Sequence, residues 1–86
     1  MEKFLAEIDI MPKEDLLDPQ GKLVNEALHS MNLKSIRNLR MGKHIRFIVE
    51  CEREEEVEEI IKIACRKLLV NPVVEEFKFR ILSIKE

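Results

Sequence analysis

The spacing of apolar residues changes along the chain, and this change most constrains what the chain can fold into. From Glu54 to Leu69 apolar side chains recur every three or four positions, as on one face of a helix. Glutamates fill the first turns of this segment, while Arg66 and Lys67 lie in the last, an arrangement that suits the helix dipole. We interpret the acidic run as a solvated helix start rather than a metal site. Asn71-Pro72 should end the helix, because the residue before a proline disfavours helical geometry.

A second helix is predicted to begin at Asp18-Pro19 and to stop near Asn32. An aspartate can accept hydrogen bonds from the free N–H groups at a helix start, and proline has no N–H to leave unpaired there. The apolar stripe expected to face the core consists of Leu23, Val24, Ala27, Leu28 and Met31.

Alternating apolar and polar residues predict strands in the other segments. Lys3 to Met11 alternates in this way, and Phe77 to Leu82 does so near the other end of the chain. Ile36 to Met41 and His44 to Cys51 are predicted to form a hairpin. Gly42 lies between them and is expected to supply a positive φ in the turn.

The resulting order, β-α-β-β-α-β, predicts an α+β fold of the ferredoxin-like class. This is a two-layer domain in which both helices cover one face of an antiparallel sheet. The other sheet face would carry Leu5, Ile48, Leu82 and Ile84 among charged residues, which favours sheet-to-sheet or edge pairing in a dimer. A chain of 86 residues leaves no room for a second core, so residues 1–86 are taken as one domain.

The charge and composition exclude several classes of function. With 15 basic and 17 acidic residues, the net charge of −2 offers no positive field for nucleic acid or anionic lipid. No apolar run approaches the roughly 20 residues that span a bilayer, and no signal-peptide pattern is present, so a cytoplasmic location is expected. Cys51 and Cys65 lack redox or zinc-site spacing and are interpreted as reduced, buried thiols.

The chain carries no recognisable catalytic or cofactor motif. Its serines, cysteines and histidines form no nucleophile signature, and no His/Cys cluster has metal-ligand spacing. His29 and His44 are interpreted as surface or edge residues. Gly21, in the first helical turn, is less favourable than alanine by up to about 1 kcal/mol, which a close approach of another backbone would explain. These features favour a binding or assembly role over an independent enzyme.

Four stretches of the chain resemble the PurS family. They are Leu17-Asp18-Pro19-Gln20-Gly21-Lys22, Ala27-Leu28-His29-Ser30, Arg40-Met41-Gly42-Lys43 and Lys67-Leu68-Leu69-Val70-Asn71-Pro72-Val73-Val74-Glu75. Together they extend over nearly the whole chain, and the first and last are the most specific. The chain departs from the family at Lys13-Glu14-Asp15, where Lys-Pro-Gly is frequent, and at Phe77, where tyrosine is common.

The resemblance implies a non-catalytic assembly and ammonia-transfer subunit of phosphoribosylformylglycinamidine synthase. That enzyme converts formylglycinamide ribonucleotide (FGAR), glutamine and ATP to the amidine (FGAM) in de novo purine biosynthesis. In the family, a PurQ-type glutaminase releases ammonia and a PurL-type synthetase uses ATP and Mg. The small subunit bridges them as a homodimer or tetramer. No catalytic residue, cofactor or metal is expected on this chain itself.

A partner interface is predicted from surface residues of the resembling stretches. It comprises Asp18, Pro19, Gln20, Gly21, Lys22, His29, Arg40, Gly42, Lys43, Asn71 and Pro72. For Asp18 and Pro19 the alternative is that they only cap a helix.

The alternative function is an ACT-like or PII-like module that binds a small effector between paired sheets. An acylphosphatase would need an Arg and an Asn on a phosphate-binding loop, and the loop from Pro12 to Leu17 has no Arg and no Gly. An RNA-binding module would need aromatic residues on its central strands, and Ile36 to Met41 has none.

Overall fold

Three antiparallel strands form the sheet of the computed structural model, which describes residues 1–84. The central strand β1 (Glu2–Pro12) pairs with β2 (Lys43–Cys51) on one side and with β3 (Glu75–Ile84) on the other. The period-two pattern of β1 buries one side of the strand, at Phe4, Ala6, Ile8 and Ile10. The register extends this apolar face across the sheet, because Ile8 lies opposite both Ile45 and Phe79.

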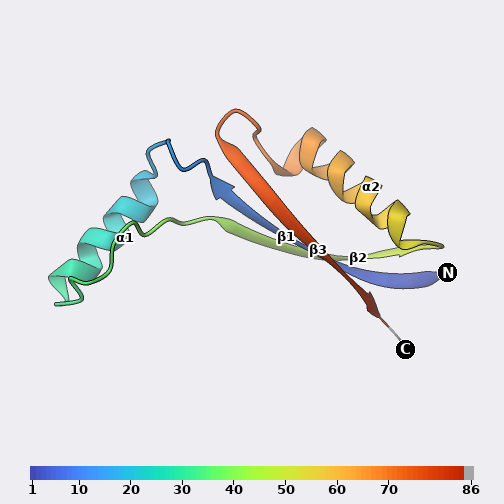
Figure 1. Cartoon of the computed structure of the whole chain (residues 1–86), viewed down its shortest axis with the longest axis horizontal. Coiled ribbons are helices and arrows are strands. Elements are labelled where there is room, and N and C mark those ends of the chain that lie inside the picture. Colours follow the sequence, from blue (N-terminus) through green and yellow to red (C-terminus); the bar gives the residue numbers. More distant parts are fainter. Residues whose placement is uncertain (85–86) are drawn as a thin grey trace.

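Helix α2 (Glu54–Ala64) covers this face of the sheet (Figure 1). Its own residues Val57 and Ile61 face the sheet and are fully buried. The helix continues into a π-helical turn, η1 (Cys65–Leu69). The helix predicted over residues 54–69 is therefore confirmed, with a wider last turn. Cys51 and Cys65 are free and buried, as predicted, and burial raises the pKa of the Cys65 thiol.

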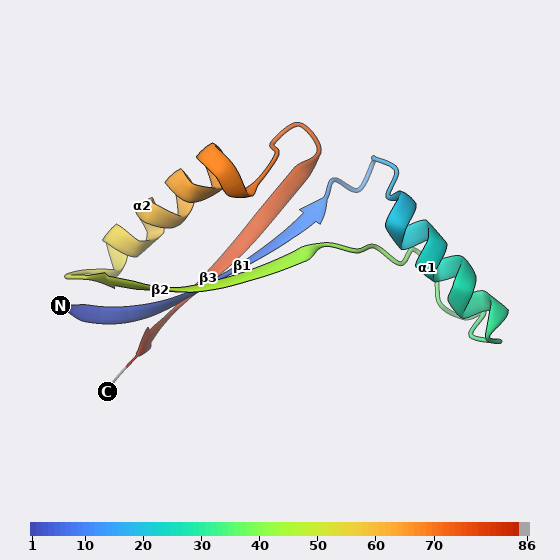
Figure 2. The ribbon, with the colours of Figure 1, turned by 180° about the vertical axis from the view of Figure 1, so that it is seen from behind.

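Helix α1 (Pro19–Ser30) does not lie on the sheet (Figures 1 and 2). In the described part of the chain it packs against none of the strands and not against α2. Gly21 is its one buried residue, while Leu23 and Met31, expected in the core, are each 67% exposed. The prediction that both helices cover one sheet face is correct for α2 and wrong for α1.

The segment that carries α1, residues 13–42, projects from the sheet, and we call it the arm. The radius of gyration is 16.8 Å, whereas a compact domain of this length has about 12 Å. The molecule measures 52 × 31 × 14 Å and is arched, with α1 at one end and the sheet at the other (Figure 1).

The strand predicted over Ile36 to Met41 is not formed, and this segment is instead a loop that returns along the arm. Its backbone groups bind side chains rather than a neighbouring strand, since Ile36 O contacts the His29 ring and Met41 N–H binds Asp18. Asn38 also has a φ of 56°, which interrupts extended geometry. The α+β class and the antiparallel sheet are confirmed, and the order β-α-β-β-α-β fits apart from this segment.

The sheet face opposite α2, which we call the outer face, carries an apolar row. Leu5 lies between Ile48 and Leu82 in the register of the three strands, as the sequence predicted. Charged residues follow along the strands: Glu7 lies 3.4 Å from Arg46, and Asp9 lies 2.6 Å from the His44 ring and 3.1 Å from Arg80. None of the helices within residues 1–84 is long and apolar enough to cross a membrane.

Candidate functional site

Asp18 joins the start of α1 to the loop that leads into β2. Its side chain, 10% exposed, accepts hydrogen bonds from the backbone N–H of Gly21 at 3.0 Å and of Met41 at 2.8 Å. These two bonds, first that from Met41 and then that from Gly21, lower the pKa of Asp18. Asp18 is thus a helix cap, but it also fixes the return of the chain from the arm.

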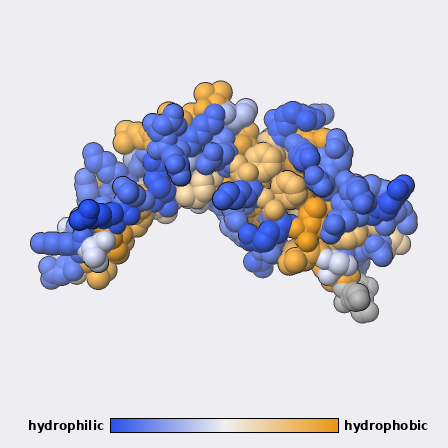
Figure 3. Space-filling model, viewed as in Figure 1, coloured by the Kyte–Doolittle hydropathy of each residue, from blue (hydrophilic) through white to orange (hydrophobic). Residues whose placement is uncertain are grey.

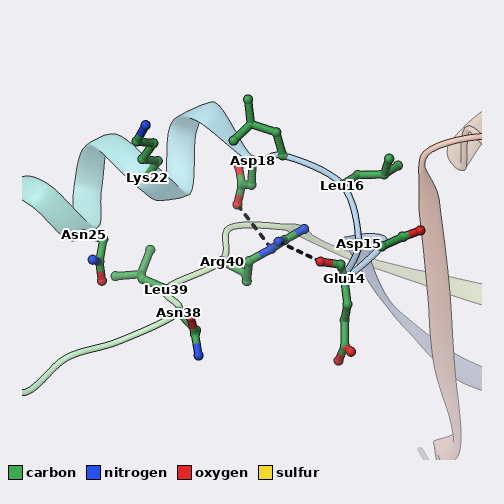
Figure 4. Close-up of a pocket in the computed structure, with 10 residues that line it drawn as sticks. Glu14, Asp15, Leu16, Asp18, Lys22, Asn25, Asn38, Leu39 and Arg40 are labelled. Carbon is green, nitrogen blue, oxygen red and sulfur yellow. Dashed lines mark hydrogen bonds and ion pairs between the residues drawn. The ribbon is translucent and has the colours of Figure 1, made fainter.

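Arg40 holds the other side of the same region (Figure 4). Its guanidinium donates hydrogen bonds to the carbonyl oxygens of Lys13 at 2.8 Å and Glu14 at 3.3 Å. Its Nε lies 3.9 Å from an Asp18 carboxylate oxygen and makes no hydrogen bond. The loop after β1 and the loop before β2 are therefore tied together by one side chain.

Both glycines allow a close approach of backbone. A Cβ on Gly21 would lie 2.8 Å from the carbonyl oxygen of Leu39 and would also meet the Asp18 carboxylate. The prediction of a close backbone contact at Gly21 is confirmed. A Cβ on Gly42 would collide with the carbonyl oxygen of Ile10 and the sulfur of Met11. Gly42 has no positive φ, so that prediction was wrong, and the need for glycine there is steric.

The turn between η1 and β3 is closed by its own hydrogen bonds and is joined to the base of the arm. Asn71 accepts from the N–H of Glu75 at 2.8 Å, and its own N–H donates to the Glu75 carboxylate, also at 2.8 Å. Lys43 lies 3.5 Å from the same carboxylate. The N–H of Lys13 donates to the carbonyl oxygen of Val74 at 2.9 Å. This turn presents exposed Pro72 and Val73 to solvent.

Most of the predicted interface residues meet where β1 ends and where β2 and β3 begin. We call this region the elbow, made of residues 12–22, 40–43 and 71–75. It contains Asp18, Pro19, Gln20, Gly21, Lys22, Arg40, Gly42, Lys43, Asn71 and Pro72. His29 is separate, at the far end of the arm, where its Nε2 lies 2.7 Å from the carbonyl oxygen of Ile36.

Two hollows open at the elbow. One of about 800 Å³ lies between α1 and the loops, lined by Leu17, Asp18, Lys22, Asn25, Leu39 and Arg40 among others (Figure 4). The other, of about 480 Å³, lies between the base of the arm and the sheet and includes Asp9, Met11, Arg40 and Lys78. Across residues 1–84 no group of three or more His, Cys, Asp or Glu could hold a metal ion. The arrangement is suited to binding another surface.

Sequence reasoning missed some residues of the elbow and of the hollow beside it. It assigned no role to Glu75, the acceptor shared by Lys43 and Asn71, or to Asn25, whose buried amide oxygen makes no hydrogen bond. It also missed the backbone partners of Arg40 and Asp18, because no residue type marks a carbonyl or N–H group that will be used. The string from Lys67 to Glu75 was the one signal that pointed to Glu75.

Comparison with known proteins assigns the chain to a family. The family model PurS, described as phosphoribosylformylglycinamidine (FGAM) synthase, matches residues 5–83. The chain belongs to the PurS family. It is 40% identical to the phosphoribosylformylglycinamidine synthase subunit PurS of Thermotoga maritima, covering 93% of this chain and 98% of the relative. The corresponding protein of Bacillus subtilis is 32% identical over 94% of this chain and 95% of its own.

Solved structures of PurS proteins have the same fold. The crystal structure of the T. maritima PurS subunit superposes with a TM-score of 0.86, covering 93% of this chain and 92% of that one. A chain in the structure of PurLQS from T. maritima gives a TM-score of 0.89 at 40% identity, covering 95% of this chain and 100% of that one. The PurS assignment favours the first of the two functions kept open from the sequence over the ACT-like or PII-like module.

Proposed function

We propose that this chain is the non-catalytic assembly subunit of a phosphoribosylformylglycinamidine synthase. Its partners are a PurL-type synthetase and a PurQ-type glutaminase, in keeping with its 40% identity to a chain of the T. maritima PurLQS structure. The observation that carries the proposal is the elbow, where a hydrogen bond from Met41 to Asp18 joins the stretches at 18–22 and 40–43, and an ion pair between Lys43 and Glu75 joins 40–43 to 71–75. A surface whose segments are held in place by such contacts suits docking of a partner, because less ordering is needed on binding.

In the proposed complex the glutaminase releases ammonia, and the synthetase uses it with ATP and Mg to convert FGAR to FGAM. The chain binds no cofactor and holds the two enzymes together, so that ammonia passes between them. The whole chain, residues 1–86, acts as one domain. It self-associates as a dimer or tetramer, and the complex works in the cytoplasm.

The elbow residues divide into two groups in this proposal. Asp18, Gly21, Arg40 and Gly42 shape the surface, because each is engaged with backbone of a neighbouring segment. The exposed members provide the contacts with a partner, namely Pro19, Gln20, Lys22, Lys43, Asn71 and Pro72. His29 joins the end of α1 to the returning loop at Ile36, so in this proposal it maintains the shape of the tip of the arm.

Reconstitution with matched synthetase and glutaminase tests the role of the chain. We expect FGAM formation from glutamine to require the chain, while FGAM formation from added ammonium by the synthetase alone does not. Equal glutamine-driven rates with and without the chain, and no co-elution of the three proteins, would refute the assembly role.

The elbow is tested by reversing one exposed charge. Lys43→Glu should weaken co-elution with the partners and lower the glutamine-driven rate by about tenfold or more, since a like charge is placed beside Glu75 in the contact surface. Lys62→Glu is the matched control, because Lys62 is half-exposed on α2 and pairs with Glu58 at 3.0 Å. If both variants assemble like the unmodified chain, the elbow is not the contact surface.

A further inference from the structure

The most exposed large apolar side chains of residues 1–84 lie in and beside the elbow. Apart from Met1, they are Leu68, Leu17 and Val73, which are 83%, 76% and 75% exposed. Leu17 and Val73 belong to the elbow, and Leu68 lies in η1, directly before it. Single exposed apolar residues are common, whereas several that gather in one region mark a contact surface. We call these three residues the crest.

The segments that carry the crest form the summit of the arch. Both ribbon views place the loop between β1 and α1, and the turn between η1 and β3, on this convex side (Figures 1 and 2). The two segments are joined, because the N–H of Lys13 donates to the carbonyl oxygen of Val74 at 2.9 Å. In the space-filling view apolar atoms stand at the top of the outline, over the turn between η1 and β3 (Figure 3). The crest is therefore a protrusion and not the wall of a groove.

Leu68 is presented by the π-helical turn that ends α2. The N–H of Val70 donates to the carbonyl oxygen of Cys65 at 3.0 Å, five residues earlier, which gives the wider geometry. Such turns are rare and frequently occur at functional sites. Cys65 and Val70, at the two ends of the turn, are buried in the core. Leu68 is thus held in place from both sides while its side chain is left in water.

Val73 is held in place by Asn71. The N–H of Val73 donates to the side-chain oxygen of Asn71 at 3.2 Å, and the N–H of Val74 donates to its backbone oxygen at 3.1 Å. These bonds use the backbone groups of the turn, so the apolar side chain of Val73 is the part that remains for a partner. A side chain that is already positioned loses less conformational freedom when it is buried in a complex.

Two cations lie directly before Leu68. Arg66 and Lys67 are exposed, and within residues 1–84 neither makes an ion pair. Their charge suits the end of a helix, and it also places unpaired donors at the margin of the crest. Protein interfaces typically have an apolar centre and a polar rim. The partner surface that complements this arrangement is apolar at its centre and acidic at its rim.

A second copy of the chain does not offer such a surface in the hollows at the elbow. Most of the residues that line the larger hollow are charged or carry an amide, such as Asp15, Lys22 and Asn25. The smaller hollow is lined in the same way, for example by Asp9 and Lys78. Burying an apolar side chain against such groups would remove water from them without supplying hydrogen bonds. The crest therefore fits a different protein.

We propose that the crest docks on an apolar surface with an acidic rim on one of the two partner enzymes. Leu17, Leu68 and Val73 pack against the apolar centre, and Arg66 and Lys67 pair with carboxylates at the rim. The inference rests on the proposed function. It adds the chemistry of the surface that receives the elbow and extends the contact to η1, outside the elbow.

Thiol labelling of a substituted chain tests whether the crest is covered. Val73→Cys should react with a maleimide in the free chain, and about tenfold or more slowly after matched synthetase and glutaminase are added. The label is read from the intact mass of the 10.2 kDa chain, so thiols of the enzymes do not interfere. Lys62→Cys, on α2, should label at the same rate in both states. The unmodified chain gives the background, because native Cys51 and Cys65 are buried.

Affinity for the enzymes tests the chemistry of the contact. Leu68→Ser should raise the dissociation constant of the complex by about tenfold, the loss typical of an apolar anchor at an interface. Leu68→Met, which keeps an apolar side chain of similar volume, should stay within about twofold. Lys67→Glu should weaken binding as well, because it places an acid against the acidic rim. All three variants should keep the circular dichroism spectrum of the unmodified chain, since residues 67 and 68 are exposed.

Three outcomes would overturn the docking of the crest, and they are distinguishable. If the unmodified chain assembles with the enzymes while Val73→Cys stays reactive and Leu68→Ser binds normally, the proposed function stands and the crest is not its contact surface. If the unmodified chain does not assemble, both proposals fail together. Protection of Val73→Cys in the chain alone, growing with its concentration, would show that a second copy covers the crest.

Discussion

Single residues at the elbow are fixed by contacts with backbone groups that are distant in sequence. Asp18 reaches Met41, Arg40 reaches Lys13, and Gly21 makes room for Leu39. A helix cap at Asp18 could be predicted from the Asp-Pro pair alone. Its second bond could not, because Met41 was expected in a strand whose N–H groups would bind another strand.

The charge of Asp18 should make stability depend on pH. Its folded-state pKa lies below the ordinary 3.8, so ionised Asp18 stabilises the fold above pH 3.8, and this contribution is lost as the pH falls through the folded-state pKa. Asp18→Asn should therefore lower the urea midpoint at pH 7, and the difference from the unmodified chain should shrink toward pH 3. A difference that stays constant between pH 7 and pH 3 would contradict this assignment.

Replacing Gly21 by alanine should destabilise the chain, although alanine is normally the better helix former. The added Cβ would lie 2.8 Å from Leu39 O, and overpacking of this kind costs about 1–3 kcal/mol, more than the gain of about 1 kcal/mol in helix propensity. Thermal unfolding measures the effect. Gln20→Ala, at an exposed position of the same turn, should change the free energy of unfolding by less than about 0.5 kcal/mol. A more stable Gly21→Ala variant would show that the backbone is not so close.

Among the elements, those with buried faces could be predicted and those fixed by side-chain bonds could not. β1 and α2 follow their apolar periods because Ile8, Val57 and Ile61 meet in one core. The α1 stripe is equally regular, yet periodicity does not say which surface covers a stripe. Ile36 to Met41 has apolar residues like a strand, but His29 and Asp18 bind its backbone instead.

The two isoleucines at positions 60 and 61 of α2 give a matched test of the core. Ile61→Ala should lower the free energy of unfolding by about 2–5 kcal/mol, because the side chain is fully buried against the sheet. Ile60→Ala removes the same atoms from a side chain that is 41% exposed, so its effect should be smaller by about 1 kcal/mol or more. Denaturant titration compares them, and equal losses would mean that α2 is rotated relative to this description.

At the scale of the whole molecule, the sequence predicted the fold class and missed the shape. The apolar residues of the outer sheet face favoured self-association, which stays a prediction, and nothing in the order of elements indicated a radius of gyration of 16.8 Å. A projecting arm depends on the bonds at its base. These bonds join Asp18 and Arg40 to backbone atoms, which leave no mark in composition or periodicity.

The self-association included in the proposed function predicts that stability depends on protein concentration. If two copies cover one another's apolar surfaces, association stabilises the folded chain by mass action, and the melting temperature should rise between 1 and 100 μM. Leu23→Glu, on the exposed stripe of α1, should lower the melting temperature mainly at the higher concentration. A melting temperature that is the same at both concentrations would contradict this prediction and would show that the chain is stable as a monomer.

The ties at the base of the arm also have a mechanical consequence. The backbone of Gly42 lies against Ile10, and Arg40 grips the loop that follows the same strand, so the arm has no free hinge where it meets the sheet. A force applied near His29, at the far end of the arm, would therefore reach the segments that hold Lys43 and Asn71 instead of being absorbed by bending at the base.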